Sequence, residues 1–198
     1  FLCWNRINNL NQIYDYSIVQ LSSTKEEHLA VIVDRYNPSD NLANYLASGN
    51  TIKIAQLEDL IEALSDLFSK LSDADIYCYS INPSNILMNG GEFLALKEFI
   101  NSYPNFYQQE QYLPPELIEC HQAGRYVLNI KSDIYALGVT MFEAYTSKAI
   151  WKDHKSIIDY NNARFENTTS KYLLSGTRVP EKLRVLFKWT LHDEPIVR

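Results

Sequence analysis

The sequence predicts an α+β fold in which a small β element precedes a mostly helical body. Three observations lead to this fold class. Two β-branched runs, YSIVQLSS and HLAVIVDRY, lie close together near the start of the 198-residue chain. Apolar residues then recur at helical spacing between Leu57 and Leu71. Finally, the segment from Ser132 to Thr146 is apolar in nearly every helical direction, which is typical of a helix at the centre of a domain.

The first 36 residues supply the β element. Residues 1–12 read as the end of a helix, and the two β-branched runs follow it. Between them stands the charged turn Lys25-Glu26-Glu27, which favours a short antiparallel pair. The pattern changes after Tyr36. Residues 37–48 predict a turn and a short helix with Asp40 as its N-cap.

The longest predicted helix shows one apolar face and one charged face. Its apolar stripe consists of Leu57, Leu60, Ile61, Leu64, Leu67, Phe68 and Leu71. A β-hairpin follows between Ile86 and Leu96, because the Asn89-Gly90 pair provides the positive φ angles that a tight turn needs. Pro180 and Glu181 begin the last predicted helix, whose shared face consists of Leu183, Leu186, Phe187 and Thr190.

Composition and charge narrow the function classes. Hydrophobic residues make up 46% and charged residues 21%, and no run of about 18 apolar residues could span a bilayer. The net charge of −6, without a Lys/Arg cluster, argues against nucleic acid and against a membrane as partner. Cys3, Cys78 and Cys120 show no CxxC spacing, which favours reduced thiols and a cytoplasmic location, with association with the cytoskeleton left open.

A series of motifs, in order, resembles the eukaryotic protein kinases. The stretch VIVDRYNPSDNLANYL is similar to the last small-lobe strand, the hinge and the first large-lobe helix, and CYSINPSNIL is similar to the HRDLKPxNIL loop. KEFI falls where DFG belongs, YLPPE resembles APE, SDIYALGV resembles SDxWSxGV, and HDEPIVR resembles the closing DPxxR. The resemblance implies a protein-kinase-like fold. Residues 1–36 would be part of the small lobe, with a helix end and two strands, and residues 37–198 the large lobe. Since there is no initiator Met and the pattern stops at Arg198, we expect a piece of a longer protein.

The resemblance also implies that the catalytic loop has lost its chemistry. Kinases use an Asp to accept the hydroxyl proton, and a Lys with two Mg²⁺ ions to hold phosphate charge. Ser80 stands at the position of that Asp, and Asn82 at the position of the loop Lys. Losing a positioned base typically costs about 10²- to 10⁴-fold in rate. We therefore expect no catalytic residue, with Ser80 and Asn82 as degenerate positions.

The metal and nucleotide positions are better preserved. Asn85 retains the amide that would bind one Mg²⁺, and Glu98 retains a carboxylate in place of the DFG Asp, one methylene longer. Mg²⁺ demands near-ideal octahedral geometry, so Glu98 is an imperfect ligand. Asn85 and Glu98 are thus expected to form a vestigial site that holds ATP and Mg²⁺ weakly or not at all. Ile100 replaces the Gly of DFG and removes its backbone freedom.

In contrast, the residues that keep the fold are present. Glu116 and Arg198 match the pair that forms a salt bridge in the large lobe of the family. Asp133 matches the Asp that holds the backbone of the catalytic loop, and Gly138 the Gly that allows close packing. These four residues are the expected structural positions.

The first hypothesis is therefore a catalytically inactive kinase-like domain, a pseudokinase, that acts as a scaffold or allosteric partner of other proteins in a larger assembly. Two alternatives stay open. One is a divergent serine/threonine kinase that uses Asn85 and Glu98 for Mg²⁺ and takes its base from elsewhere. The other is a nucleotide-binding switch without catalysis, whose stability would depend on ATP without turnover.

Overall fold

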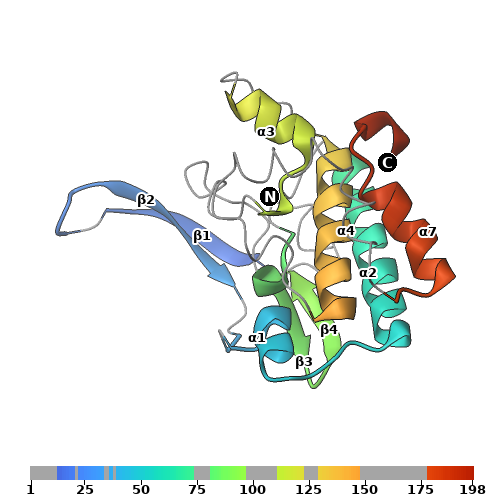
Figure 1. Cartoon of the computed structure of the whole chain (residues 1–198). Helices are drawn as coiled ribbons and strands as arrows, with labels where there is room; N and C mark the ends of the chain where they lie inside the picture. Colours follow the sequence, from blue (N-terminus) through green and yellow to red (C-terminus); the bar gives the residue numbers. More distant parts are fainter. Residues whose placement is uncertain are drawn as a thin grey trace.

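The computed structural model describes residues 13–20, 22–33, 36–37, 39–73, 81–96, 111–122, 129–147 and 178–198. Within these ranges the fold is α+β and mostly helical, as the sequence predicts (Figure 1). Its elements are β1 (Ile13–Gln20), β2 (Glu27–Val33), α1 (Leu42–Ala47), α2 (Ile54–Asp73), β3 (Ile86–Asn89), β4 (Glu92–Leu96), α3 (Pro115–Gln122), α4 (Ile130–Thr146) and α7 (Glu181–Thr190), with 3-10 turns at Pro83–Asn85 and Pro195–Val197. The helix end predicted for residues 1–12 lies outside the described ranges.

Strands β1 and β2 form an antiparallel ribbon that projects from the helical body (Figure 1). Ser17 faces Ala30 and Ile18 faces Leu29 in its register. The predicted pair of strands is therefore confirmed. The turn comes one residue earlier than expected, because Glu27 already belongs to β2 and Lys25 takes the left-handed backbone conformation with φ of 57°.

Helix α1 begins with a different cap from the one predicted. The side chain of Asn41, and not that of Asp40, accepts a hydrogen bond from the backbone N–H of Asn44 at 2.9 Å. Asn41 has the extended backbone of a cap residue, with φ of −132°. It owes this conformation to an antiparallel bridge with Leu87 of β3. A long-range contact thus decides which of two neighbouring residues caps the start of the helix.

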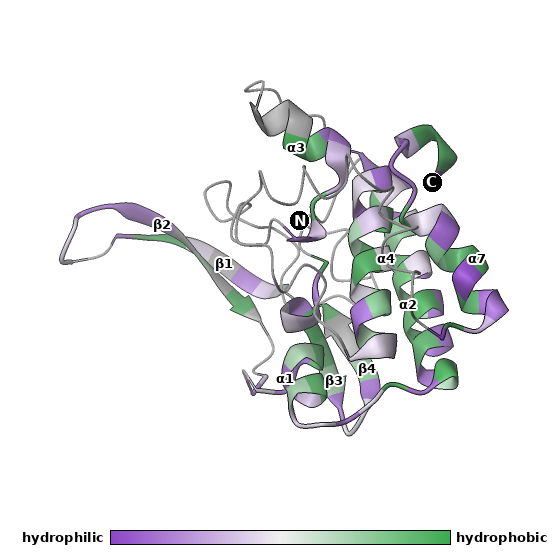
Figure 2. Cartoon of the chain, in the orientation of Figure 1, coloured by the Kyte–Doolittle hydropathy of each residue, from purple (hydrophilic) through white to green (hydrophobic). Residues whose placement is uncertain are grey.

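The hydrophobic core includes much of α2 and α4, whose ribbons carry many hydrophobic residues (Figure 2), together with residues of α1, the strands β3 and β4, and α7. Helix α2 buries the predicted stripe except Ile61, which is half-buried: Leu57, Leu60, Leu64, Leu67, Phe68 and Leu71. Helix α4 is buried from Tyr135 to Ala144 without interruption, which confirms the prediction of a central helix. No helix in the described ranges has both the length and the apolarity needed to cross a membrane.

The central helix α4 begins two residues before the predicted start at Ser132. Asn129 is its N-cap, and its side-chain oxygen accepts a hydrogen bond from the backbone N–H of Ser132 at 3.2 Å. The two additional helical residues are Ile130 and Lys131. The predicted start was taken from the kinase-like motif, which begins at Ser132, and the motif does not include the cap residue.

Helix α7 packs closely on α4 at a glycine. A Cβ atom added at Gly138 would lie 2.5 Å from Oγ1 and 2.8 Å from Cβ of Thr190. The rings of Phe142 and Phe187 meet edge to face nearby, with centroids 5.6 Å apart. Gly138 therefore allows a helix approach that a larger residue would prevent.

Strands β3 and β4 form the predicted antiparallel hairpin, in which Ile86 faces Leu96 and Asn89 faces Glu92. The positive φ angles of its turn belong to Gly90 (58°) and Gly91 (95°), and not to Asn89. The prediction from the Asn-Gly pair is thus wrong by one residue. Side-chain nitrogen Nε2 of Gln56 donates a 2.7 Å hydrogen bond to the carbonyl oxygen of Gly91, which ties this turn to α2.

Candidate functional site

The candidate site is the loop Ile81–Asn85, which leads from the helical body into β3. Ile81, Asn82, Pro83 and Asn85 are buried, and only Ser84 is exposed. Pro83 begins the 3-10 turn, where its fixed φ suits the first position and its missing N–H costs no hydrogen bond. The loop therefore packs tightly against the hydrophobic core.

Asn82 holds this loop together. Its side-chain oxygen Oδ1 accepts hydrogen bonds from the backbone N–H of Ser84 at 2.9 Å and of Asn85 at 3.1 Å. Its backbone carbonyl also accepts from the N–H of Asn85 at 3.0 Å. Only 3% of Asn82 is exposed. The amide is thus turned inward as a cap, and it brings no positive charge to the loop.

Asn85 ends the 3-10 turn and is 7% exposed. Ser80, the other position expected to be degenerate, lies outside the described residues, and so do Glu98 and Ile100. The structure therefore does not place Glu98 relative to Asn85. The paired role of these two residues toward nucleotide or Mg²⁺ stays a prediction.

The described residues fit a metal ion poorly. They hold no group of three or more His, Cys, Asp or Glu side chains that could bind a metal. Of the expected pair, they contain only the neutral amide of Asn85. Mg²⁺ in proteins is usually held by carboxylates and phosphates together with water. We therefore derive no chemical step through a metal at this site.

The hairpin that follows the loop is joined to α1. Leu87 forms an antiparallel bridge with Asn41, and the backbone N–H of Met88 donates to the carbonyl oxygen of Asp40 at 3.1 Å. This junction fixes the strand that Asn85 leads into. It was not predicted, because a single bridge between distant segments leaves no periodic pattern in the sequence.

The structure brings the expected structural residues Glu116 and Arg198 together. Nη2 of Arg198 lies 2.6 Å from Oε2 of Glu116, and the Arg198 side chain is fully buried. Ser132 donates to the other carboxylate oxygen of Glu116 at 3.4 Å. Nη1 of Arg198 donates to the carbonyl oxygen of Lys131 at 3.3 Å, and the guanidinium lies 5.2 Å from the ring centroid of Tyr135. The ion pair thus links α3 and the last 3-10 turn to the start of α4.

Asp133 is buried in the first turn of α4, with 1% of its surface exposed. It has an interaction partner within the chain. The resemblance assigns Asp133 to the backbone of the catalytic-loop segment, of which the structure describes only the part from Ile81 onward. Its role toward that segment therefore stays a prediction.

A buried polar pair that the sequence did not reveal lies ahead of α3. The hydroxyl of Tyr112 donates to Oε2 of Glu143 on α4 at 2.6 Å. Burial, and then the nearby Glu143 carboxylate, raise the pKa of Tyr112 well above its ordinary value. The one available signal was the position of Glu143, an acid within the mostly apolar second half of the helix.

The comparisons with known proteins agree with the motif order. The family model of the protein kinase domain matches residues 3–198, which is nearly the whole chain. A search of the curated proteins finds no match.

Proposed function

Because the chain belongs to the protein kinase family, we propose that it is a catalytically inactive member, a pseudokinase, that acts as a protein-interaction module. The observation that carries the proposal is the side chain of Asn82. It stands at the position of the family's loop Lys, and its oxygen accepts hydrogen bonds from two backbone N–H groups of the loop. It serves the loop as a cap.

The chemistry of phosphoryl transfer explains why this matters. Catalysis in the family consists mostly of positioning and of neutralising charge on the transferred phosphate. A neutral, buried amide at position 82 supplies neither a charge nor a mobile donor. Ser80, at the position of the catalytic base, has a hydroxyl that does not accept a proton at neutral pH as a carboxylate does. Both changes act on the same step.

The supporting framework is intact by comparison. The buried ion pair of Glu116 with Arg198 and the close approach of α7 at Gly138 keep the helical body in order. A sequence that maintains such packing without the catalytic groups still presents a fixed surface. We therefore propose other proteins as partners, within a larger assembly. The net charge of −6 disfavours nucleic acid in that role.

The test combines unfolding and phosphate transfer on the purified chain. We expect no transfer of the γ-phosphate of ATP, either to the chain itself or to a general protein substrate, above a reaction without the chain. We also expect no shift in the unfolding temperature with millimolar ATP and Mg²⁺. A ligand at a hundred times its dissociation constant would add about 2.7 kcal/mol, or a few degrees.

Two variants separate the alternatives. Transfer that disappears in Glu98→Ala but persists in Glu92→Ala, which removes an exposed carboxylate of β4, would establish a divergent kinase and overturn the proposal. A Mg²⁺-dependent rise in the unfolding temperature without transfer, lost in Asn85→Ala, would instead establish a nucleotide-binding switch.

A further inference from the structure

An apolar groove lies between α2 and α7, and α4 also contributes to its lining. Its volume is about 430 Å³. Phe68 of α2, Leu137 of α4 and Leu186 of α7 are among the apolar residues that line it. The two outer helices are joined by the ion pair of Lys182 with Glu58. The groove is thus bounded by helices that are held to one another.

Helix α7 carries exposed apolar side chains beside this groove. Trp189 is 58% and Val185 46% exposed, and their spacing of four residues places them on one side of the helix. Leu186 and Thr190, which follow these two residues in the sequence, line the groove itself. Tryptophan is enriched at protein interfaces, where it often fills a pocket of the partner. Trp189 is therefore a candidate anchor for a partner.

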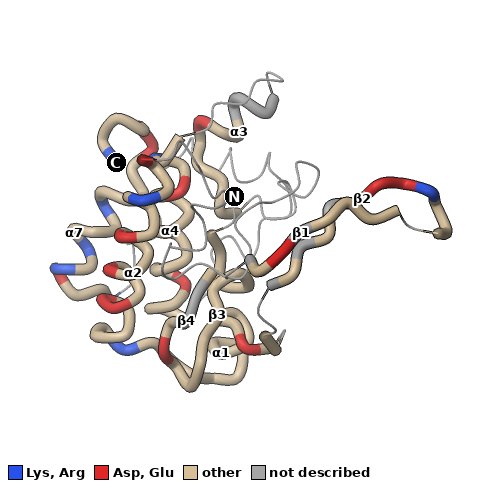
Figure 3. Tube along the Cα trace, turned by 180° about the vertical axis from the view of Figure 1, so that it is seen from behind, with Lys and Arg blue, Asp and Glu red and all other residues tan. Residues whose placement is uncertain are grey.

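The charges on the two helices are mostly of opposite sign. Figure 3 shows acidic residues along α2 beside basic residues along α7. The exposed ones include Asp59 and Glu62 on α2 and Lys188 on α7, and none of these three forms an ion pair within the described parts of the chain. The two exceptions, Lys70 on α2 and Glu181 on α7, are each paired within their own helix. The surface formed by the two helices, which we call the α2/α7 face, thus has an acidic half and a basic half.

Such a face is complementary to its own copy. A half-turn about a two-fold axis places α7 of one copy against α2 of the other, and the symmetry forms each contact twice. The basic half then meets the acidic half in both contacts. A partner whose surface is uniformly acidic or uniformly basic would instead be repelled by one of the two helices. The charge pattern therefore favours a second copy of the chain.

We propose that two copies of the chain associate through the α2/α7 face, with Trp189 of each copy in the groove of the other. The groove has the volume of pockets that hold drug-sized ligands, which exceed an indole ring in size. Two helices side by side and the 20-residue length of α2 give about 20 by 30 Å, or roughly 600 Å² on each copy. This area is at the lower end for a specific interface, so we expect a weak dimer.

The inference goes beyond the proposed function, because it names a second copy of the chain as a partner and uses no residue of the loop Ile81–Asn85. An active kinase could form the same dimer. Association and phosphate transfer are therefore tested by separate measurements, and either proposal can fail without the other.

Sedimentation equilibrium of the purified chain, from low to several hundred micromolar, measures the association. We expect a reversible equilibrium between monomer and dimer. Trp189→Ala should weaken it at least about tenfold, because an aromatic anchor is lost at two symmetric contacts. Lys188→Glu should weaken it at least about fivefold, because an acid then stands in the basic half at both contacts. Since both side chains are exposed, the unfolding temperature of the dilute variants should stay unchanged, which excludes misfolding as the cause.

Ile18→Ala and Lys25→Glu are the matched controls, and both lie in the ribbon of β1 and β2. Ile18 is 72% exposed, and thus more exposed than Trp189. Lys25→Glu changes the net charge by the same amount as Lys188→Glu. Neither control should alter the association.

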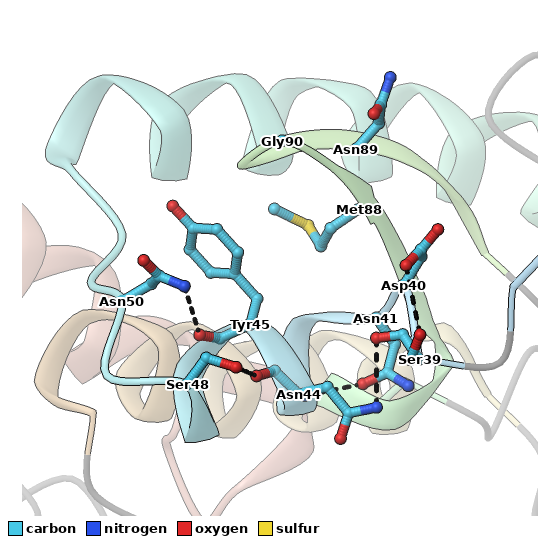
Figure 4. A pocket seen from close by; sticks show the side chains of 10 residues that line it. All are labelled: Ser39, Asp40, Asn41, Asn44, Tyr45, Ser48, Asn50, Met88, Asn89 and Gly90. Carbon is cyan, nitrogen blue, oxygen red and sulfur yellow. Dashed lines mark hydrogen bonds between the residues drawn. The ribbon is translucent and has the colours of Figure 1, made fainter.

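Backbone amide signals of the isotope-labelled chain locate the contact. With rising concentration, the signals of residues 61–73 and 182–190 should shift. Those of the polar pocket between α1 and the end of β3, which contains no residue of α2 or α7, should not (Figure 4). A chain that stays monomeric, a dimer that tolerates both Trp189→Ala and Lys188→Glu, or an equal weakening by Ile18→Ala would each overturn the inference.

Discussion

The hydroxyl of Tyr112 and the carboxylate of Glu143 form a buried hydrogen bond of 2.6 Å. Tyr112 is 9% and Glu143 6% exposed. The bond joins the segment ahead of α3 to the last turn of α4, two parts that no local pattern connects. A carboxylate at this depth needs such donors, because a buried charge without them is costly. The pair is thus a polar anchor inside an apolar region.

Removing the Tyr112 hydroxyl should destabilise the chain. We expect Tyr112→Phe to lower the free energy of unfolding by about 1–3 kcal/mol, since a buried charged acceptor loses one of its donors. Denaturant unfolding measures this change. Tyr45→Phe is the control, because no hydrogen bond is formed by the Tyr45 hydroxyl within the described residues. It should change stability by less than about 0.5 kcal/mol. An equal loss of unfolding free energy in the two variants would show that the hydrogen bond to Glu143 does not stabilise the fold.

The same pair should make the chain sensitive to alkaline pH. The pKa of Tyr112 is raised in the folded state, so the unfolded state releases this proton first. Its contribution is therefore complete below the unfolded pKa of about 10 and is lost as the pH rises above it, by about 1.4 kcal/mol per pH unit. Unfolding curves between pH 9 and 11 should fall less steeply for Tyr112→Phe than for the unchanged chain. Parallel curves would show that Tyr112 titrates normally.

Breaking the ion pair between Arg198 and Glu116 should be among the most damaging single changes. Arg198→Met leaves the Glu116 carboxylate without its charged partner, and loss of one member of a buried pair costs about 3–5 kcal/mol. Arg184→Met is the matched control, because Arg184 pairs with the exposed Glu181 at 3.7 Å. Exposed pairs contribute about 0–1 kcal/mol. Similar unfolding temperatures for both variants would mean that burial adds nothing to this pair.

The sequence predicted the elements whose signal is local. The apolar stripe of α2 and the continuous burial of α4 follow from side-chain spacing alone. The hairpin followed from its glycines, although the positive φ angles lie at Gly90 and Gly91. Motif order also indicated that Glu116 and Arg198 belong together, because the family resemblance carries their positions.

What the sequence did not predict depends on contacts between distant segments. Asp40 and Asn41 are both good capping residues, and only the bridge from Asn41 to Leu87 decides between them. The hydrogen bond between Tyr112 and Glu143 was not predicted either, because the two residues are 31 positions apart in the sequence. At position 82 the resemblance indicated a lost Lys, whereas the hydrogen bonds show that the replacing amide has a structural role.

The close packing of α4 against α7 predicts the effect of enlarging Gly138. An added Cβ would lie 2.5 Å from Oγ1 of Thr190 and 2.9 Å from Cδ2 of Leu191, so Gly138→Ala forces the helices apart. Overpacking costs about 1–3 kcal/mol, partly offset by the higher helix propensity of Ala. In thermal unfolding, the double variant with Thr190→Ala should recover part of the loss. A rise in unfolding temperature for Gly138→Ala alone would show that α4 and α7 can move apart without loss of stability.

The last prediction separates the capping role of Asn82 from the positive charge of the Lys that the family's motif has at this position. Asn82→Asp keeps an oxygen acceptor for the N–H groups of Ser84 and Asn85 and should retain stability within about 0.5 kcal/mol. Asn82→Lys restores the family's charge but supplies no acceptor, and it should cost about 1–2 kcal/mol. Denaturant unfolding of both variants decides the matter. If Asn82→Lys were as stable as the unchanged chain, the two hydrogen bonds would contribute nothing, and position 82 would be free to carry a phosphate-binding charge.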